Sequence, residues 1–233
     1  MELEKTSEKN PHLIQILRKG LPDKLSSNME IEIRFGTLMD KATQKRLSIK
    51  MLHPCIMERS DTLWFEASVT ENDFTQMKKY FSTMFKDSEE KLIIDTLLKG
   101  IRRSEVREIN GESVRVDPVI IKKKKLFFLD IFCPFSKYDM RISVCEEIVQ
   151  KDTFGMQQVQ GNIREKKRTT YTHPLFVVDV TEVNSGKESA DIKYFTPSYE
   201  IEIEANNKTY EKDVFINIVN NSIDAIRQAL KHR

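Results

Sequence analysis

The chain has 233 residues, of which 39% are apolar, and its 38 lysines and arginines nearly balance its 36 aspartates and glutamates. The net charge of only +2 excludes the strongly basic composition of a general nucleic-acid-binding domain, so any anionic ligand must be bound by charges gathered locally. The sequence contains no apolar run of about eighteen residues and does not begin like a secretory leader, which predicts a soluble, intracellular protein without membrane contact.

The first part of the chain predicts one helix and one strongly amphipathic strand. Residues 12–19 have the composition of a short helix. From residue 29 to residue 35 every second side chain is apolar, and this period of two predicts a strand with its charges on one face, ending or bending at Gly36. The charged residues of this stretch are Glu30, Glu32 and Arg34.

The middle and second half of the chain are predicted to be mostly β. Residues 63–69 predict a strand, after which Thr70 or Asn72 caps a helix with apolar residues at three- and four-residue spacing. Asn110-Gly111 lies between two alternating stretches and predicts a hairpin turn. The other alternating stretches are residues 123–132, 139–145, 163–172, 176–183 and 199–205. About eight antiparallel strands at short spacing favour a closed barrel or a sandwich.

Two acidic ladders give the main indication of function. They are Glu30 and Glu32 on one predicted strand, and Glu200, Glu202 and Glu204 on another. A solvated strand face also alternates, but it usually mixes charges of both signs because neighbouring like charges repel. Carboxylates two residues apart project side by side, and two facing strands can offer three oxygens to Mg²⁺ or Mn²⁺. The ladders therefore predict a divalent metal site, with a merely solvated face as the alternative.

Basic residues alternate on other predicted strands and would supply the complementary half of a site. They are Lys125, Arg141, Lys166 and Arg168. If these faces converge inside one barrel, cations and metal-binding carboxylates line a concave site that suits a polyphosphate. The lysine run at 122–125, taken alone, is equally consistent with an exposed edge or a nuclear import patch.

Other catalytic chemistries lack their sequence signals. The chain has no GxxxxGK[ST] phosphate loop, no GxGxxG and no GxSxG, and its four histidines have no serine or cysteine motif around them. Its three cysteines are scattered without CxxC spacing, which predicts buried thiols. Water activated at a metal ion is the remaining interpretation.

Taken in order, six segments resemble the mRNA 5′-triphosphatases of the fungal and protozoal type, which are triphosphate tunnel metalloenzymes. The segments are EIEIRFG at 30–36, the basic strand ending at Lys125, YDMRIS at 138–143, REKKRTTY at 164–171, VDVTEV at 178–183 and YEIEIE at 199–204. The resemblance implies a mainly β (α+β) fold, in which a closed eight-stranded antiparallel barrel surrounds a tunnel. It implies one domain over residues 1–233, with a short helix in segment 1–28, the barrel at 29–206 and a C-terminal helix at 211–231.

The resemblance also implies a role for each charged residue. The implied metal ligands are Glu30, Glu32 and Glu204. The cations that would hold the γ-phosphate are Lys125, Arg141, Lys166 and Arg168, of which Lys125 stands where the fungal pattern has arginine. The carboxylates that would orient water are Glu202 and Asp179, with Glu200 in support, and Arg34, Thr181 and Arg164 are further candidates.

The implied activity is removal of the γ-phosphate from 5′-triphosphate RNA with Mg²⁺ or Mn²⁺, the first step of mRNA capping. The implied setting is the nucleus, with an mRNA guanylyltransferase as partner, and a homodimer is left open. Two other functions remain as alternatives. One is a tunnel enzyme acting on tripolyphosphate, thiamine triphosphate or free nucleotides, and the other is a non-catalytic module that binds phosphorylated RNA ends.

Overall fold

The structure is a computed structural model that describes residues 10–98, 100–108, 118–150, 162–186 and 197–230. Its helices are α1 (Pro11–Gly20), α2 (Glu71–Met84) and α3 (Lys212–Ala229). Its strands are β1 (Met29–Asp40), β2 (Lys45–Arg46), β3 (Cys55–Met57), β4 (Leu63–Glu66), β5 (Ser88–Leu98), β6 (Ile101–Glu108), β7 (Val119–Phe132), β8 (Asp139–Gln150), β9 (Asn162–His173), β10 (Phe176–Gly186) and β11 (Ser198–Ala205). No helix within these ranges combines the length and the apolar character that a membrane crossing requires.

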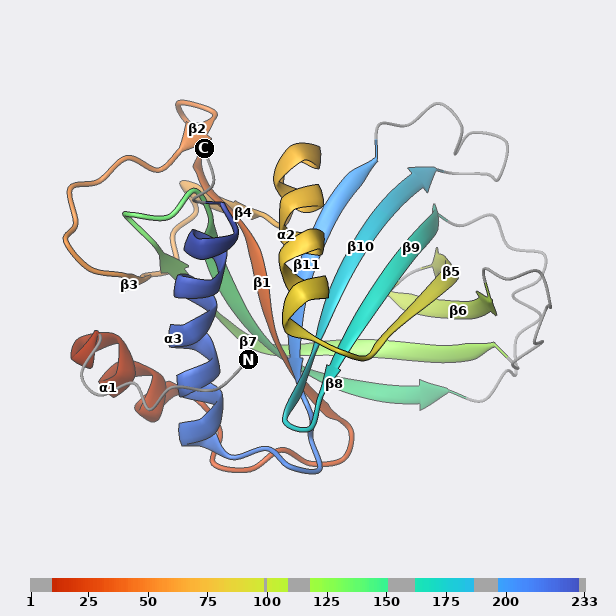
Figure 1. The fold of residues 1–233 in the computed structure, drawn as a ribbon. Coiled ribbons are helices and arrows are strands. Elements are labelled where there is room, and N and C mark those ends of the chain that lie inside the picture. Colours follow the sequence, from red (N-terminus) through yellow and green to blue (C-terminus); the bar gives the residue numbers. More distant parts are fainter. Residues whose placement is uncertain (1–9, 99, 109–117, 151–161, 187–196, 231–233) are drawn as a thin grey trace.

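Eight of these strands close into one antiparallel barrel. The order around the ring is β11, β10, β9, β5, β6, β7, β8 and β1, and β1 pairs again with β11 to complete it. The short strands lie off this ring, because β2 and β4 pair with the end of β1 and β3 pairs with β7. Figure 1 shows α2 and α3 lying over the outer side of the barrel and α1 lying beside α3.

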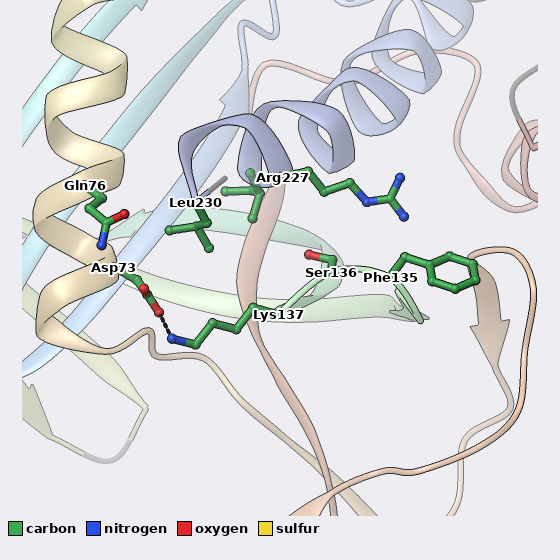
Figure 2. A pocket seen from close by; sticks show the side chains of 8 residues that line it. Asp73, Gln76, Phe135, Ser136, Lys137, Arg227 and Leu230 are labelled. Carbon is green, nitrogen blue, oxygen red and sulfur yellow. Dashed lines mark ion pairs between the residues drawn. The ribbon is translucent and has the colours of Figure 1, made fainter. Parts of the chain in front are cut away.

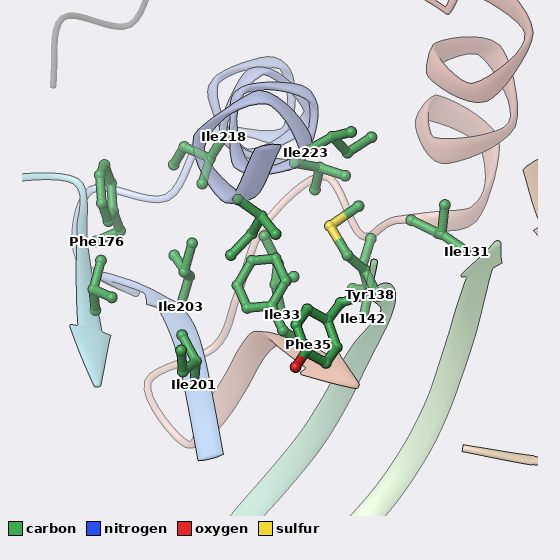
Figure 3. Packing of buried hydrophobic residues seen from close by; sticks show 14 of the residues in the cluster. Ile33, Phe35, Ile131, Tyr138, Ile142, Phe176, Ile201, Ile203, Ile218 and Ile223 are labelled. Atoms are coloured by element: carbon green, nitrogen blue, oxygen red, sulfur yellow. The ribbon is translucent and has the colours of Figure 1, made fainter. Parts of the chain in front are cut away.

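The apolar core lies between the outer face of the barrel and helix α3. The alternate residues Ile31 and Ile33 of β1 are fully buried, and Ile201 and Ile203 of β11 are nearly so. Figure 3 shows side chains of both strands pointing toward Ile218 and other residues of α3. Each such burial contributes about 1.5 to 3 kcal/mol. Because neighbouring side chains on a strand point to opposite faces, this packing turns the glutamates between the isoleucines into the barrel.

Helix α2 is joined to the turn between β7 and β8 by polar contacts. Thr70 caps the helix by accepting a hydrogen bond from the backbone N–H of Asp73. The Tyr138 hydroxyl donates to the Asp73 carboxylate at 2.6 Å, and Lys137 forms an ion pair with the same carboxylate (Figure 2). These contacts border an outer pocket of about 460 Å³ that Phe135 and the end of α3 also line. They fix the position of α2 over the barrel.

The sequence predicts this fold well in outline. The closed eight-stranded barrel, the first strand, the Thr70-capped helix and the C-terminal helix are confirmed. The strand predicted at 63–69 is shorter, because β4 ends at Glu66 and Val69 forms only an isolated bridge to Tyr199. No strand was predicted at the position of β5, and the predicted Asn110-Gly111 turn lies outside the described residues.

The sequence predicted that the first strand ends or bends at Gly36. Strand β1 does not end there but continues to Asp40. A Cβ atom at residue 36 would clash with the backbone carbonyl of Glu66 and would lie 2.9 Å from the Phe65 ring. Glycine is therefore required at residue 36, where the end of β4 comes close to β1.

We expect Gly36→Ala to lower the free energy of unfolding by about 1 to 3 kcal/mol, because backbone atoms cannot move aside as a flexible side chain can. Urea denaturation measures this change. Gly20→Ala is the matched control, since a Cβ atom there would meet only the Leu129 side chain at 3.6 Å, an ordinary contact. An equal loss in both variants would contradict the assigned role of Gly36.

Candidate active site inside the barrel

The barrel encloses a cavity of about 510 Å³ whose walls are mostly charged. The carboxylates that line it are Glu30, Glu32, Glu147, Glu200, Glu202 and Glu204. The cations that line it are Arg34, Arg102, Lys123, Arg164, Lys166 and Arg168. The two sets are equal in number, so a polyanion together with a cation could enter the cavity without a large net charge.

The pairing of β1 with β11 creates the acidic wall. Glu32 lies directly opposite Glu204, and Arg34 lies directly opposite Glu202. The Nε atom of Arg34 is 2.9 Å from the Glu32 carboxylate and 3.0 Å from that of Glu202. One arginine thus joins two of the acidic residues, while Glu204 has no ion pair or hydrogen bond with any side chain in the described ranges.

Burial changes the proton affinity of this wall. Burial raises the pKa of Glu32 to about 7, although the charge of Arg34 opposes the shift. Burial, with the charges of Glu30 and Asp179, raises the pKa of Glu204 to about 8. Glu202 is different, because Arg34 and Arg168 outweigh the effect of burial and lower its pKa. Glu32 and Glu204 therefore have too little positive charge nearby to offset their burial, whereas Glu202 has enough.

The cations on the facing strands are held in fixed positions. Lys166 lies 2.5 Å from Asp95 of β5, and burial lowers the pKa of this lysine. Arg168 lies 2.7 Å from Asp179 and donates to the Thr181 hydroxyl at 3.1 Å. Such pairing fixes the direction of long side chains before a ligand binds, which reduces the entropy lost on binding.

The structure brings most of the predicted site residues together. Those that line the cavity are Glu30, Glu32, Lys166, Arg168, Glu200, Glu202 and Glu204, and the further candidates Arg34 and Arg164 also line it. Asp179 does not line the cavity but supports Arg168 from the neighbouring strand. Lys125 and Arg141 also lie outside the cavity lining.

The lysine of the 122–125 run that lines the cavity is Lys123, whereas the sequence pointed to Lys125. It forms ion pairs with Glu30 and, at 3.2 Å, with Glu147. Lys125 is exposed and lies with its Nζ atom 4.5 Å from the centre of the Phe128 ring. A β-bulge between Lys125 and Phe127 separates the lysines of β7 from its aromatic residues.

Arg141 is held away from the cavity by its own partner. It donates two hydrogen bonds to the Asp130 carboxylate, at 2.6 and 2.8 Å. Other residues of the site that the sequence did not suggest are Asp95, Arg102 and Glu147. Asp95 lies on β5, where the sequence predicted no strand. Arg102 lies on β6, where the sequence showed only part of a strand pattern.

The chemistry of the acidic wall fits a divalent metal ion. Carboxylate oxygens are the ligands that Mg²⁺ and Mn²⁺ prefer, and the unpaired Glu204 lies opposite Glu32 across the pair of strands. In the part of the chain that the structure describes, no three acidic, histidine or cysteine side chains already converge on one point. Lys123 holds Glu30 and Arg34 holds Glu32, so a bound ion would compete with these two cations for oxygens.

The fold and this site define a triphosphate tunnel barrel, a closed antiparallel barrel with opposed acidic and basic walls. Residues 12–224 match the family described as mRNA capping enzyme, beta chain, and the chain belongs to that family.

Fungal mRNA-capping enzyme beta subunits are similar in sequence. The one from Schizosaccharomyces pombe is 25% identical over 194 residues, which are 77% of this chain and 63% of the relative. The one from Candida albicans is 26% identical over 209 residues, covering 80% of this chain and 39% of the relative. This chain therefore spans less than two thirds of the length of these relatives.

Two solved structures share the fold. The Pct1 RNA triphosphatase of S. pombe has a TM-score of 0.70 at 19% identity, over 95% of this chain and 90% of that one. The mimivirus capping enzyme triphosphatase has a TM-score of 0.55 at 14% identity, over 93% and 96% of the two chains. At such low identity the likeness establishes the barrel alone.

We expect Glu204→Gln to stabilise the metal-free protein. The native pKa of Glu204 is about 8 against an ordinary value of 4.5, so ionisation of this group weakens the folded state as the pH rises between these values. Above pH 8 the neutral glutamine should raise the free energy of unfolding by roughly 1 to 3 kcal/mol, and near pH 4 it should change little.

Thermal unfolding across this pH range measures the effect. Glu200→Gln is the control on the same strand, since Glu200 is paired with Arg164 at 2.6 Å and its neutralisation should lower stability. Equal destabilisation by the two substitutions would show that Glu204 is not an unpaired charge.

Proposed function

We propose that the protein hydrolyses the γ-phosphate of 5′-triphosphate RNA, giving a 5′-diphosphate end and inorganic phosphate, as the first step of mRNA capping. The observation that carries the proposal is the enclosed cavity with a row of carboxylates on β1 and β11 facing cations on β7 and β9. A triphosphate needs both kinds of wall, because the bound metal ion and the phosphate-binding cations must act on the same phosphoryl group. Membership of the capping enzyme beta chain family supports the same reaction.

Each side chain has a role in this proposal. Glu30, Glu32 and Glu204 would hold Mg²⁺ or Mn²⁺, which would supply a positive charge next to the γ-phosphate. Lys123, Lys166 and Arg168, which line the cavity, would bind the phosphate oxygens and stabilise charge as the bond breaks.

The remaining carboxylates would orient the arginines and the attacking water. Glu202 fixes Arg34 and Arg168 and can orient the attacking water, and Asp179 fixes Arg168 from behind. Glu200 holds Arg164 at the cavity wall. Of the predicted phosphate-binding cations, Lys125 and Arg141 lie just beyond the cavity, so we assign the direct contact on β7 to Lys123.

Partners and location follow from the proposed reaction. A 5′-diphosphate RNA end is the substrate of an mRNA guanylyltransferase, so we propose such an enzyme as partner and the nucleus as the location. A further structure of S. pombe Pct1, with a TM-score of 0.68, is described as a complex with the Spt5 CTD. We propose that this chain also binds a segment of the transcription machinery. A homodimer stays a prediction.

Release of inorganic phosphate from γ-labelled 5′-triphosphate RNA tests the proposal. We expect release with Mg²⁺ or Mn²⁺, loss of release with a chelator, and a fall of about 10²- to 10³-fold or more in Glu32→Ala. Glu146→Gln is the matched control, because Glu146 lies on the outer face of β8 and pairs with exposed Lys124.

The same assay separates the alternatives. Faster turnover of tripolyphosphate than of triphosphate RNA would favour a small-molecule tunnel enzyme. Tight binding of triphosphate RNA without phosphate release under any metal would favour a non-catalytic binding module and would refute the proposed hydrolysis.

Two lysines of the same run provide a second test. Lys123→Ala should lower turnover by about 10²-fold or more, because it removes a cation from the cavity wall and leaves Glu30 unpaired. Lys125→Ala should change turnover much less, since this side chain lies outside the cavity lining. Steady-state rates with triphosphate RNA compare them, and a larger loss in Lys125→Ala would reverse the assignment.

A further inference from the structure

A second hollow, of about 260 Å³, adjoins the active-site cavity along the pair of strands β1 and β8. Arg34, which lines the cavity, lies directly opposite Arg141, which lines the hollow. Directly opposed residues in an antiparallel pair have Cβ atoms about 4.5 to 5.5 Å apart. The two spaces therefore lie next to each other at this pair of arginines.

The floor of the hollow is a stack of flat groups. The guanidinium carbon of Arg141 lies 4.3 Å from the centre of the Phe128 ring and 4.8 Å from that of Phe65. Asp130 fixes the plane of the guanidinium with two hydrogen bonds and neutralises its charge. Aromatic rings and fixed guanidinium planes are the groups on which proteins stack nucleobases.

Two cations near Phe128, of which Arg59 lines the hollow, have no carboxylate partner among the described residues. The guanidinium of Arg59 lies 5.6 Å from the centre of the Phe128 ring, and the Nζ atom of Lys125 lies 4.5 Å from it. Both cations lie over an aromatic ring, without a fixed ion pair. They can turn toward the phosphates of a nucleotide chain whose base occupies the stack.

Glu58 and Asp61 also line the hollow. Their negative charges make the hollow a poor site for a phosphate group itself. Carboxylates can instead accept hydrogen bonds from the amino groups on the edge of a base. The charges therefore favour a base in the hollow over a further phosphate.

We propose that this hollow binds the base of the 5′-terminal nucleoside whose triphosphate lies in the cavity. The inference rests on the proposed triphosphatase function, because the triphosphate is what places the nucleoside at the Arg34 end of the cavity. A 5′-triphosphate RNA and a free nucleoside triphosphate share the recognised chemistry, a base joined to a polyphosphate. Tripolyphosphate lacks the base and leaves the hollow empty.

Binding can be measured without any hydrolysis. Trp64 lines the hollow and is the single tryptophan of the chain, so tryptophan fluorescence reports on this hollow alone. Titration is carried out with adenosine triphosphate, with a short 5′-triphosphate oligoribonucleotide and with tripolyphosphate, in the presence of chelator so that turnover does not interfere. We expect the two base-bearing ligands to change the fluorescence and tripolyphosphate not to change it.

The comparison of the two base-bearing ligands identifies the source of the base. Tighter binding of the oligoribonucleotide assigns the hollow to an RNA end, and equal affinity assigns it to any nucleoside triphosphate. The proposal would be overturned if tripolyphosphate changed the fluorescence as much as the base-bearing ligands do. It would also be overturned if no bound ligand changed the fluorescence. The fluorescence measurement needs no phosphate release. It therefore tests the base-binding proposal separately from the proposed hydrolysis.

Phe128→Leu removes the ring and keeps an apolar side chain. We expect it to raise the KM for triphosphate RNA relative to the KM for tripolyphosphate by about tenfold, the effect of losing one stacking contact. Phe135→Leu is the matched control, because Phe135 lies 63% exposed beside the end of α3 and lines a different pocket. Thermal unfolding confirms that both variants fold.

Arg59→Gln provides a second variant that leaves the aromatic packing intact. It should weaken the binding of the oligoribonucleotide, measured by the Trp64 fluorescence, and leave the thermal transition unchanged. An equal rise in KM for tripolyphosphate and for triphosphate RNA in Phe128→Leu, together with unchanged binding in Arg59→Gln, would overturn the assignment of the hollow.

Discussion

The pairing of β1 with β11 is the constraint on which the rest of the structure depends. It closes the barrel, and in doing so it places Glu32 against Glu204 on the wall of the cavity. Like charges so close destabilise a folded protein unless cations are supplied. Arg34 supplies one of them between Glu32 and Glu202, and Lys123 supplies another at Glu30. The mixed lining of the cavity thus reduces the like-charge repulsion that closure of the barrel creates.

The sequence predicts those parts of the fold and site that depend on a regular period of two. In β1 and β11 the isoleucines alternate with the glutamates, and one face must be buried under α3, so the position of the carboxylates inside the barrel follows from the pattern. Lys166 and Arg168 of β9 follow in the same way. Strand β5 carries a weaker pattern, because its residues are mostly half-buried on both faces, and its aspartate in the site was missed for that reason.

Pairing between strands determines which charged side chains contact each other, and the period of two along one strand does not show this. Alternation along β7 puts Lys123 and Lys125 on the same face, and only the ion pairs across strands show that Lys123 meets Glu30 and Glu147. Arg141 follows the predicted alternation of β8, yet its partner Asp130 belongs to a strand adjacent in space. Ion pairs between strands depend on register and on side-chain reach, and neither can be read from one strand alone.

The bulge in β7 also determines where the length of this strand can change. One extra residue of β7 lies between Lys125 and Phe127, so Lys123 and Lys125 before it and Phe128 and Asp130 after it share the inner face. Loss of that extra residue would restore regular alternation and leave every following side chain on its present face. Loss of a residue elsewhere in the strand would instead move the side chains on one side of it to the opposite face. A change in length is therefore tolerable at the bulge and harmful elsewhere along β7.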